Sequence, residues 1–74
     1  MKVLVKLFAT FRENRFKTEE WELNEGTPVG DVLQRLNIAP KEVQILLVNG
    51  HDASDSVLLK EGDTLSLFPP VGGG

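Results

Sequence analysis

The last six residues of this chain are the ones whose types and order could take part in chemistry. They read Pro69-Pro70-Val71-Gly72-Gly73-Gly74. Two consecutive prolines remove two backbone donors and fix φ, so a strand must end there and the chain continues in an extended direction. Three glycines cannot join a core, and only glycine allows so close an approach of a backbone to another surface. Residues 69–74 are therefore predicted to form a flexible tail that threads a narrow channel in another protein.

A run of glycines at the end of a chain has a second interpretation. Exposed termini tolerate variation, so Gly72–Gly74 could also be an inert end without a role. The proline pair favours a function, because a stiff neck lowers the entropy that is lost when the tail is inserted.

The composition limits what else the chain can do. It has 74 residues, of which 41% are hydrophobic and 26% charged, and its formal net charge is −3. A chain of this size buries only about 60% of the surface that it exposes when unfolded, which permits one core but no deep catalytic cavity. No basic cluster is present to bind nucleic acid, and the absence of cysteine excludes disulfides and thiolate metal sites.

Neither a membrane nor a metal is expected as a partner. The opening MKVLVKLF is too short an apolar run for a signal peptide, and no stretch reaches membrane-spanning length. The expected location is the cytoplasm.

His51 is followed by Asp52 and Asp55 at a spacing that matches no metal-binding loop, so we interpret His51 as a solvated loop residue rather than a catalytic base.

The segments that must position the tail follow from the apolar pattern. Alternation of apolar and polar residues predicts three strands, over residues 2–8, 19–23 and 64–68. A short apolar run predicts a further strand over residues 44–48, which stops at the tight-turn signal Asn49-Gly50. Polar residues 12–18 form the first turn. The stretch between Gly50 and the last strand is irregular, with a brief strand and a short helical turn around Ser56–Leu59.

One helix is predicted in the middle of the chain. Thr27 is expected to be its N-cap, with Pro28 at the first helical position. Apolar residues then recur with helical spacing at Val29, Val32, Leu33 and Leu36. Asn37 is expected to take the left-handed stop position, and Pro40 prevents continuation.

The order of these elements indicates the fold. A single helix covers only one face of a sheet and leaves the other face solvated. The right-handed crossover rule places the last strand in the centre, parallel to the first. The sequence thus predicts an α+β fold for residues 1–68. It is a β-grasp with a mixed four- to five-stranded sheet and one main helix packed on one face.

A docking surface is predicted at the base of the tail. If Leu65 and Leu67 face the helix, Phe68 lies on the open face, with Leu47 and Phe8 beside it. Exposed apolar patches mark interaction sites, so Phe8, Leu47 and Phe68 are predicted to bind a partner. The alternative is that these side chains cap the sheet edge or complete the core.

The ending FPPVGGG resembles the FPPVxGG ending of the small subunit of molybdopterin synthase, in the MoaD group of the MoaD/ThiS family of ubiquitin-like sulfur carriers. The resemblance spans essentially the whole chain. Further family-like segments are Phe8-Ala9-Thr10-Phe11-Arg12-Glu13, Val48-Asn49 and Leu59-x-x-Gly62-Asp63-x-Leu65. The triple glycine also resembles the ThiS branch, whereas the Phe-Pro-Pro neck and the segment from Phe8 to Glu13 favour the molybdopterin branch.

The resemblance implies a carrier role for Gly74. An E1-like activating enzyme of the MoeB/ThiF type would use ATP to adenylate the Gly74 carboxylate, and a sulfur donor would convert it to a thiocarboxylate. The carrier would then dock with a MoaE-like large synthase subunit in a hetero-oligomer, inserting Pro69 to Gly73 so that sulfur reaches the pterin precursor. In this scheme the carrier binds no cofactor and is not catalytic, because the catalytic residues belong to the large subunit.

Three other functions remain open at this point. Besides the carrier role for molybdopterin or the related tungsten cofactor, the chain could carry sulfur for thiamine thiazole synthesis or another sulfur-containing metabolite, with a different docking partner. It could be a ubiquitin-like modifier joined to proteins through Gly74. It could also be a plain β-grasp binding module with an inert tail.

Overall fold

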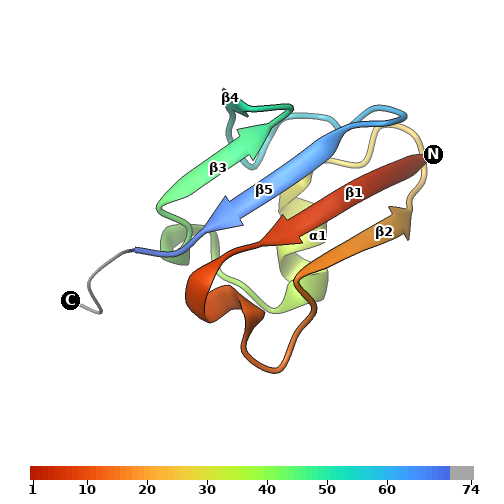
Figure 1. Cartoon of the computed structure of the whole chain (residues 1–74). Coiled ribbons are helices and arrows are strands. Elements are labelled where there is room, and N and C mark those ends of the chain that lie inside the picture. The colour runs from red at the N-terminus through yellow and green to blue at the C-terminus, as the bar shows by residue number, and fades with distance from the viewer. Residues whose placement is uncertain (71–74) are drawn as a thin grey trace.

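The computed structural model describes residues 1–70 of the chain (Figure 1). Its elements, in chain order, are strand β1 (Lys2–Leu7), 3-10 helix η1 (Ala9–Arg12), strand β2 (Thr18–Glu22), helix α1 (Val29–Leu36), 3-10 helix η2 (Pro40–Glu42), and strands β3 (Ile45–Val48), β4 (His51–Asp52) and β5 (Thr64–Phe68). The predicted order of strands and helix is confirmed to within a residue or two at each boundary. Helix η1 was not expected; it lies between the first predicted strand and the predicted turn over residues 12–18, with which it shares only Arg12.

The five strands form one mixed sheet in the order β2-β1-β5-β3-β4. Strand β5 is central. It runs parallel to β1, with Val5 beside Leu65, and antiparallel to β3, with Leu46 beside Leu67. The predicted central, parallel position of the last strand is therefore confirmed, and the chain has a β-grasp fold.

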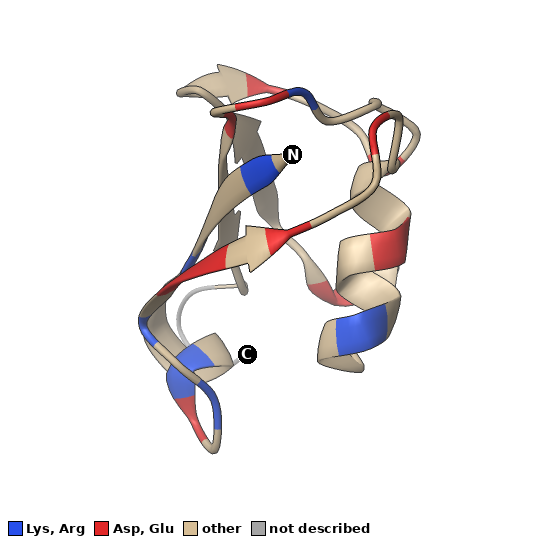
Figure 2. Ribbon diagram, turned by 90° about the vertical axis from the view of Figure 1, so that its right-hand side faces the viewer, with Lys and Arg blue, Asp and Glu red and all other residues tan. Residues whose placement is uncertain are grey.

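Helix α1 covers one face of this sheet, and residues 1–70 place no helix on the opposite face (Figures 1 and 2). Alternate strand residues point toward α1, as the sequence pattern predicts, and Leu65 and Leu67 are fully buried there. Burying a leucine side chain contributes about 1.5–3 kcal/mol. The core comprises Val3, Val5, Leu7, Phe11, Leu23, Val29, Val32, Leu33, Leu36, Ile38, Leu59, Leu65 and Leu67. We call the uncovered side of the sheet the open face.

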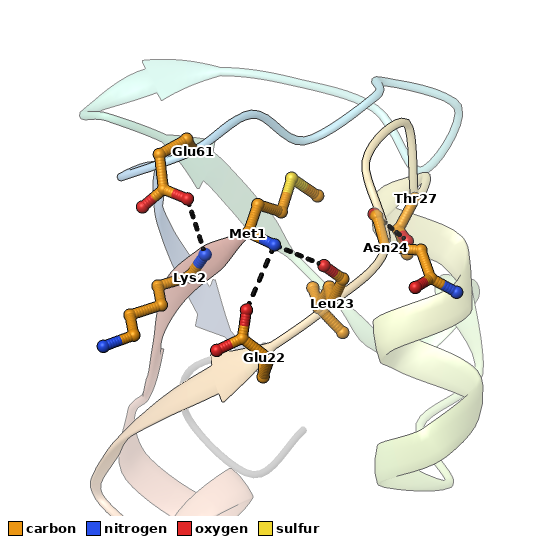
Figure 3. Close-up of polar contacts among 7 residues, drawn as sticks. All are labelled: Met1, Lys2, Glu22, Leu23, Asn24, Thr27 and Glu61. Atoms are coloured by element: carbon orange, nitrogen blue, oxygen red, sulfur yellow. Dashed lines mark hydrogen bonds and ion pairs between the residues drawn. The ribbon is translucent and has the colours of Figure 1, made fainter.

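The start of α1 differs from the prediction. Thr27 is not the N-cap, since its hydroxyl donates to the Asn24 carbonyl at 2.6 Å (Figure 3), and the capping position falls on Pro28. The first helical amides are satisfied instead by carbonyls of residues 55–57, which overlap the segment that was expected to be helical around residues 56–59. The Val29 N–H donates to the Val57 carbonyl at 2.9 Å and the Gly30 N–H to the Asp55 carbonyl at 2.8 Å.

That segment is a turn followed by an isolated bridge between Pro28 and Leu58, so the expected helical turn is wrong. Its backbone lies against the helix start, and a side chain at Gly30 would place its Cβ 3.3 Å from the Asp55 carbonyl oxygen. Glycine at this position therefore permits the close approach that caps the helix.

The end of α1 agrees with the prediction. Asn37 has a φ of 61°, and the Ile38 N–H donates to the Leu33 carbonyl at 2.9 Å, which stops the helix. Arg15 adds a contact from the loop after η1, because its Nε donates to the Leu36 carbonyl at 3.2 Å. A cation at a helix C-terminus is favourable because the last carbonyls carry partial negative charge.

The N-terminal end of β1 is held by polar contacts (Figure 3). The Met1 amine donates to the Leu23 carbonyl at 2.7 Å and lies 3.1 Å from the Glu22 carboxylate. The Lys2 N–H donates to a Glu61 carboxylate oxygen at 3.0 Å. Because β1 and β5 are parallel, this anchored end of the sheet lies opposite the end at which β5 stops.

Candidate functional site: the root of the tail

The tail begins in the middle of the sheet. Strand β5 ends at Phe68, Pro69 is buried and Pro70 is exposed. Hydrogen bonds hold the end of β5 on both sides, from the Phe8 N–H to the Leu67 carbonyl at 3.2 Å and from the Gln44 N–H to the Phe68 carbonyl at 2.8 Å. The direction in which the chain leaves the body is therefore set by Phe68 and Pro69.

The remaining predicted tail residues lie outside the described part of the chain. They are Val71, Gly72, Gly73 and Gly74. Their roles in threading and in carrying sulfur stay predictions.

The three predicted partner-binding residues share the open face. The rings of Phe8 and Phe68 are stacked, with centroids 4.2 Å apart and planes inclined by 9°. Leu47 pairs with Ser66 across β3 and β5, and Ser66 and Phe68 point to the same side of β5. All three predicted residues are half-buried. The structure thus brings them together on one face, while their binding to a partner stays a prediction.

Ile45 belongs to the same surface and was not identified from the sequence. It pairs with Phe68 and is 44% exposed. The apolar run from Ile45 to Val48 gives no alternation from which a face could be assigned. The register between β3 and β5 assigns the face. Leu46 lies beside Leu67 and points toward the core, so its neighbour Ile45 points away from the core. We call Phe8, Phe68 and Ile45 the tail-root row.

The character of the open face changes away from this row. The next row across the sheet contains Thr18, Lys6, Ser66, Leu47 and Asp52. Beyond it, Leu4 lies between Glu20 and Thr64, and Lys2 pairs with Glu22. Acidic residues accordingly lie along β2 toward the far end, while the segment that follows β1 is rich in basic residues (Figure 2).

Arg12 lies beside the tail-root row. Its Nε donates to the Leu7 carbonyl at 2.7 Å, and its Cζ lies 5.2 Å from the centroid of the Phe8 ring. Arg12 is the first residue of the polar turn that the sequence predicts over residues 12–18. The structure instead holds it half-buried against Phe8, because η1 folds the chain back toward the end of β1.

A polar cluster fixes the register on which this surface depends. Asn49 donates through Nδ2 to an Asp63 carboxylate oxygen at 2.8 Å and accepts from the Thr64 N–H at 2.9 Å. The second Asp63 oxygen accepts from the Lys60 N–H at 2.8 Å, and Asp63 is only 9% exposed. These contacts join the end of β3 to the start of β5. They also give a structural reason for the asparagine and the aspartate in two of the segments that resemble the family, Val48-Asn49 and Leu59-x-x-Gly62-Asp63-x-Leu65.

Other functional groups are sparse in the described part of the chain. His51 lies in β4 and is exposed. Within residues 1–70, no three histidine or carboxylate side chains are grouped so that they could hold a metal ion. None of the helices in that range combines the length and apolar character that crossing a membrane requires.

Comparison with known proteins identifies the family. Residues 5–74 match the model of the ThiS family. Small archaeal modifier protein 3 of Haloferax volcanii is 34% identical, with both chains covered in full. A Pyrococcus furiosus structure provisionally named molybdopterin converting factor, subunit 1, is 35% identical with a TM-score of 0.75, covering 96% of this chain and 99% of that one.

A third similar structure is a complex of subunits 1 and 2 of the molybdopterin-converting factor from Helicobacter pylori. Its matching chain is 27% identical with a TM-score of 0.64, and both chains are covered in full. Because the family model covers nearly the whole sequence, this chain belongs to the ThiS family, a group of ubiquitin-like sulfur carriers and modifiers.

Proposed function

We propose that this chain is the sulfur carrier subunit of a molybdopterin synthase. In this proposal an E1-like enzyme of the MoeB/ThiF type uses ATP to adenylate the Gly74 carboxylate, which gives a poor electrophile a good leaving group. A sulfur donor displaces the adenylate and leaves a thiocarboxylate on Gly74. The tail then enters a MoaE-like large subunit, where the sulfur is passed to the pterin precursor to build the dithiolene.

The position of the tail root is the observation that carries this proposal. Pro69 is buried and Phe68 is fixed between β1 and β3, so the tail starts from a rigid point rather than from a mobile loop. The apolar tail-root row lies immediately beside that point. A partner that binds this row would receive the tail in a defined direction, which lowers the entropy lost on insertion.

The proposal also divides the chemical roles between the carrier and the large subunit. The described residues supply a scaffold, a docking face and a starting point for the tail. Acid–base groups and the pocket for the pterin are assigned in this proposal to the large subunit. The similarity to a subunit of the molybdopterin-converting factor in Pyrococcus furiosus, and to one in complex with its second subunit in Helicobacter pylori, supports a hetero-oligomeric assembly.

A protein modifier is the second candidate function. The relative from Haloferax volcanii that matches over its full length is a small archaeal modifier protein. In that case the activated Gly74 acyl group would be attacked by a lysine amine of another protein and would form an isopeptide bond. A carrier for thiamine thiazole synthesis uses the same activation and differs in its docking partner.

Reconstitution with purified partners separates these candidates. The thiocarboxylated chain is mixed with the large synthase subunit and the pterin precursor, and in parallel with a thiazole synthase. We expect sulfur to leave the carrier only in the first mixture, with formation of the dithiolene. Transfer in the thiazole mixture alone would contradict the molybdopterin assignment. Adducts that survive denaturation, and that disappear when Gly74 is deleted, would favour the modifier.

A further inference from the structure

We propose that Arg12 binds a carboxylate of the docking partner and so acts as a specificity-determining residue beside the tail-root row. This inference rests on the proposed function, because it concerns the surface by which the carrier meets the synthase subunit. The expected partner surface places apolar side chains on Phe8, Phe68 and Ile45 and an aspartate or glutamate next to them.

The side chain of Arg12 is held in place before a partner binds. Its Nε is occupied by the Leu7 carbonyl at 2.7 Å, and its guanidinium carbon lies 5.2 Å from the Phe8 ring centroid. Within residues 1–70, the two terminal nitrogens of Arg12 have no hydrogen-bond or carboxylate partner. A planar guanidinium with its outer nitrogens available matches a carboxylate in two parallel hydrogen bonds.

The charge around the tail root supports an acidic partner. The chain as a whole has a formal net charge of −3, yet two cations, Arg12 and Lys6, lie beside the tail-root row on the open face, against one carboxylate, Asp52, at the far edge of the next row. The acidic pairs of the open face, Glu20 and Glu22, lie toward the other end of β2. The surface around the tail-root row is therefore locally positive, although the molecule as a whole is acidic. Complementary potentials between two partners give specificity and faster association.

Ile45 supplies the apolar side of the same contact. It is 44% exposed and pairs directly with Phe68, so it extends the stacked rings across a third strand. Burial of this row would exclude water from the neighbouring guanidinium and strengthen its bond to a carboxylate. An apolar centre with a charged residue at its margin is the usual arrangement of a specific interface.

The test uses the full-length carrier and the large synthase subunit as the probe. Affinity is measured by calorimetry for the wild type, Arg12→Gln and Arg35→Gln. Arg35 is an exposed arginine in the last turn of α1 and serves as the matched control. We expect Arg12→Gln to bind about 10- to 100-fold more weakly and to show a smaller dependence on salt, because a charge-assisted hydrogen bond is lost. Arg35→Gln should bind as the wild type does.

A second arm identifies the partner group. Arg12→Lys retains the charge and provides an amine that a carbodiimide joins to a carboxylate in contact with it, and Arg35→Lys is its control. We expect a crosslink from position 12 to an aspartate or glutamate of the synthase subunit, located by peptide mass spectrometry. A crosslink to the chain's own Gly74 carboxylate, or none beyond the level of the control, would overturn the assignment.

The outcomes separate this inference from the proposed function. If the wild type does not bind the synthase subunit, the proposed function fails and the Arg12 contact fails with it. If the wild type binds and Arg12→Gln binds equally well, only the Arg12 contact is wrong. Circular dichroism melting curves of the two glutamine variants confirm that each is folded before its affinity is compared.

Discussion

Phe8 and Phe68 stack with their ring centroids 4.2 Å apart, one just beyond the end of β1 and the other at the last position of β5. The two strands are parallel neighbours, so the stack closes the end of the sheet from which the tail departs. A pair of this kind contributes about 0.5–1.5 kcal/mol beyond the area it buries. It thereby joins the position of the tail to the surface on which a partner is proposed to bind.

Replacing Phe68 by aspartate should weaken partner binding while leaving the domain folded. The side chain points to the open face rather than into the core, so its loss removes the stack but creates no cavity under α1. Central aromatic residues of an interface cost about 2 kcal/mol or more when they are truncated. Calorimetry with the large subunit measures the effect, and unchanged affinity would remove Phe68 from the docking surface.

Ile45→Glu and Leu58→Glu form a matched pair. Both side chains are large, apolar and exposed, at 44% and 56%, but only Ile45 lies in the tail-root row. We expect Ile45→Glu to lower the affinity for the large subunit at least tenfold, because a carboxylate is buried against apolar groups and near a partner acid. Leu58→Glu should bind normally. Equal losses for the two variants would mean that the effect is not specific to this surface.

Deleting Gly74 should abolish sulfur transfer and leave the melting temperature unchanged. The core residues of the described part lie between positions 3 and 67, and a glycine has no side chain to add to their packing, so we expect no loss of stability. Transfer is followed in the reconstituted reaction and stability by calorimetric unfolding. A clear fall in melting temperature would show that the tail has a structural role.

Asp63→Ala should destabilise the fold by about 1–3 kcal/mol. The substitution removes a buried carboxylate that accepts hydrogen bonds from the Lys60 N–H and the Asn49 amide, and hydrogen bonds to a charged group are among the stronger ones. Asp52→Ala, at an exposed strand position, should change the free energy of unfolding by no more than about 0.5 kcal/mol. Urea unfolding of the two variants measures both values, and equal stabilities would mean that the Asp63 cluster does not fix the register.

The sequence predicted the parts of the fold that depend on local patterning. Alternation placed Leu65 and Leu67 toward the helix, and the handedness of the crossover placed β5 beside β1. The N-cap prediction failed because the helix amides of Val29 and Gly30 are bound by carbonyls from a distant segment. No local pattern around Thr27 indicates that contact.

The sequence predicted only part of the candidate site, because some of its residues are placed by contacts between distant segments. Phe8 and Phe68 follow from strand alternation and from the position of the tail. Ile45 required the register between β3 and β5, and the orientation of Arg12 required a 3-10 helix that its sequence does not signal. Both depend on pairings between segments that are far apart in the chain.

The claim that Gly74 carries sulfur is tested most directly by intact-mass spectrometry of the protein isolated from its native host. The account predicts a population in which one oxygen of the chain is replaced by sulfur, with fragmentation placing the change at Gly74. Material that only ever carries an unmodified carboxylate, under conditions where the cofactor is being made, would contradict it.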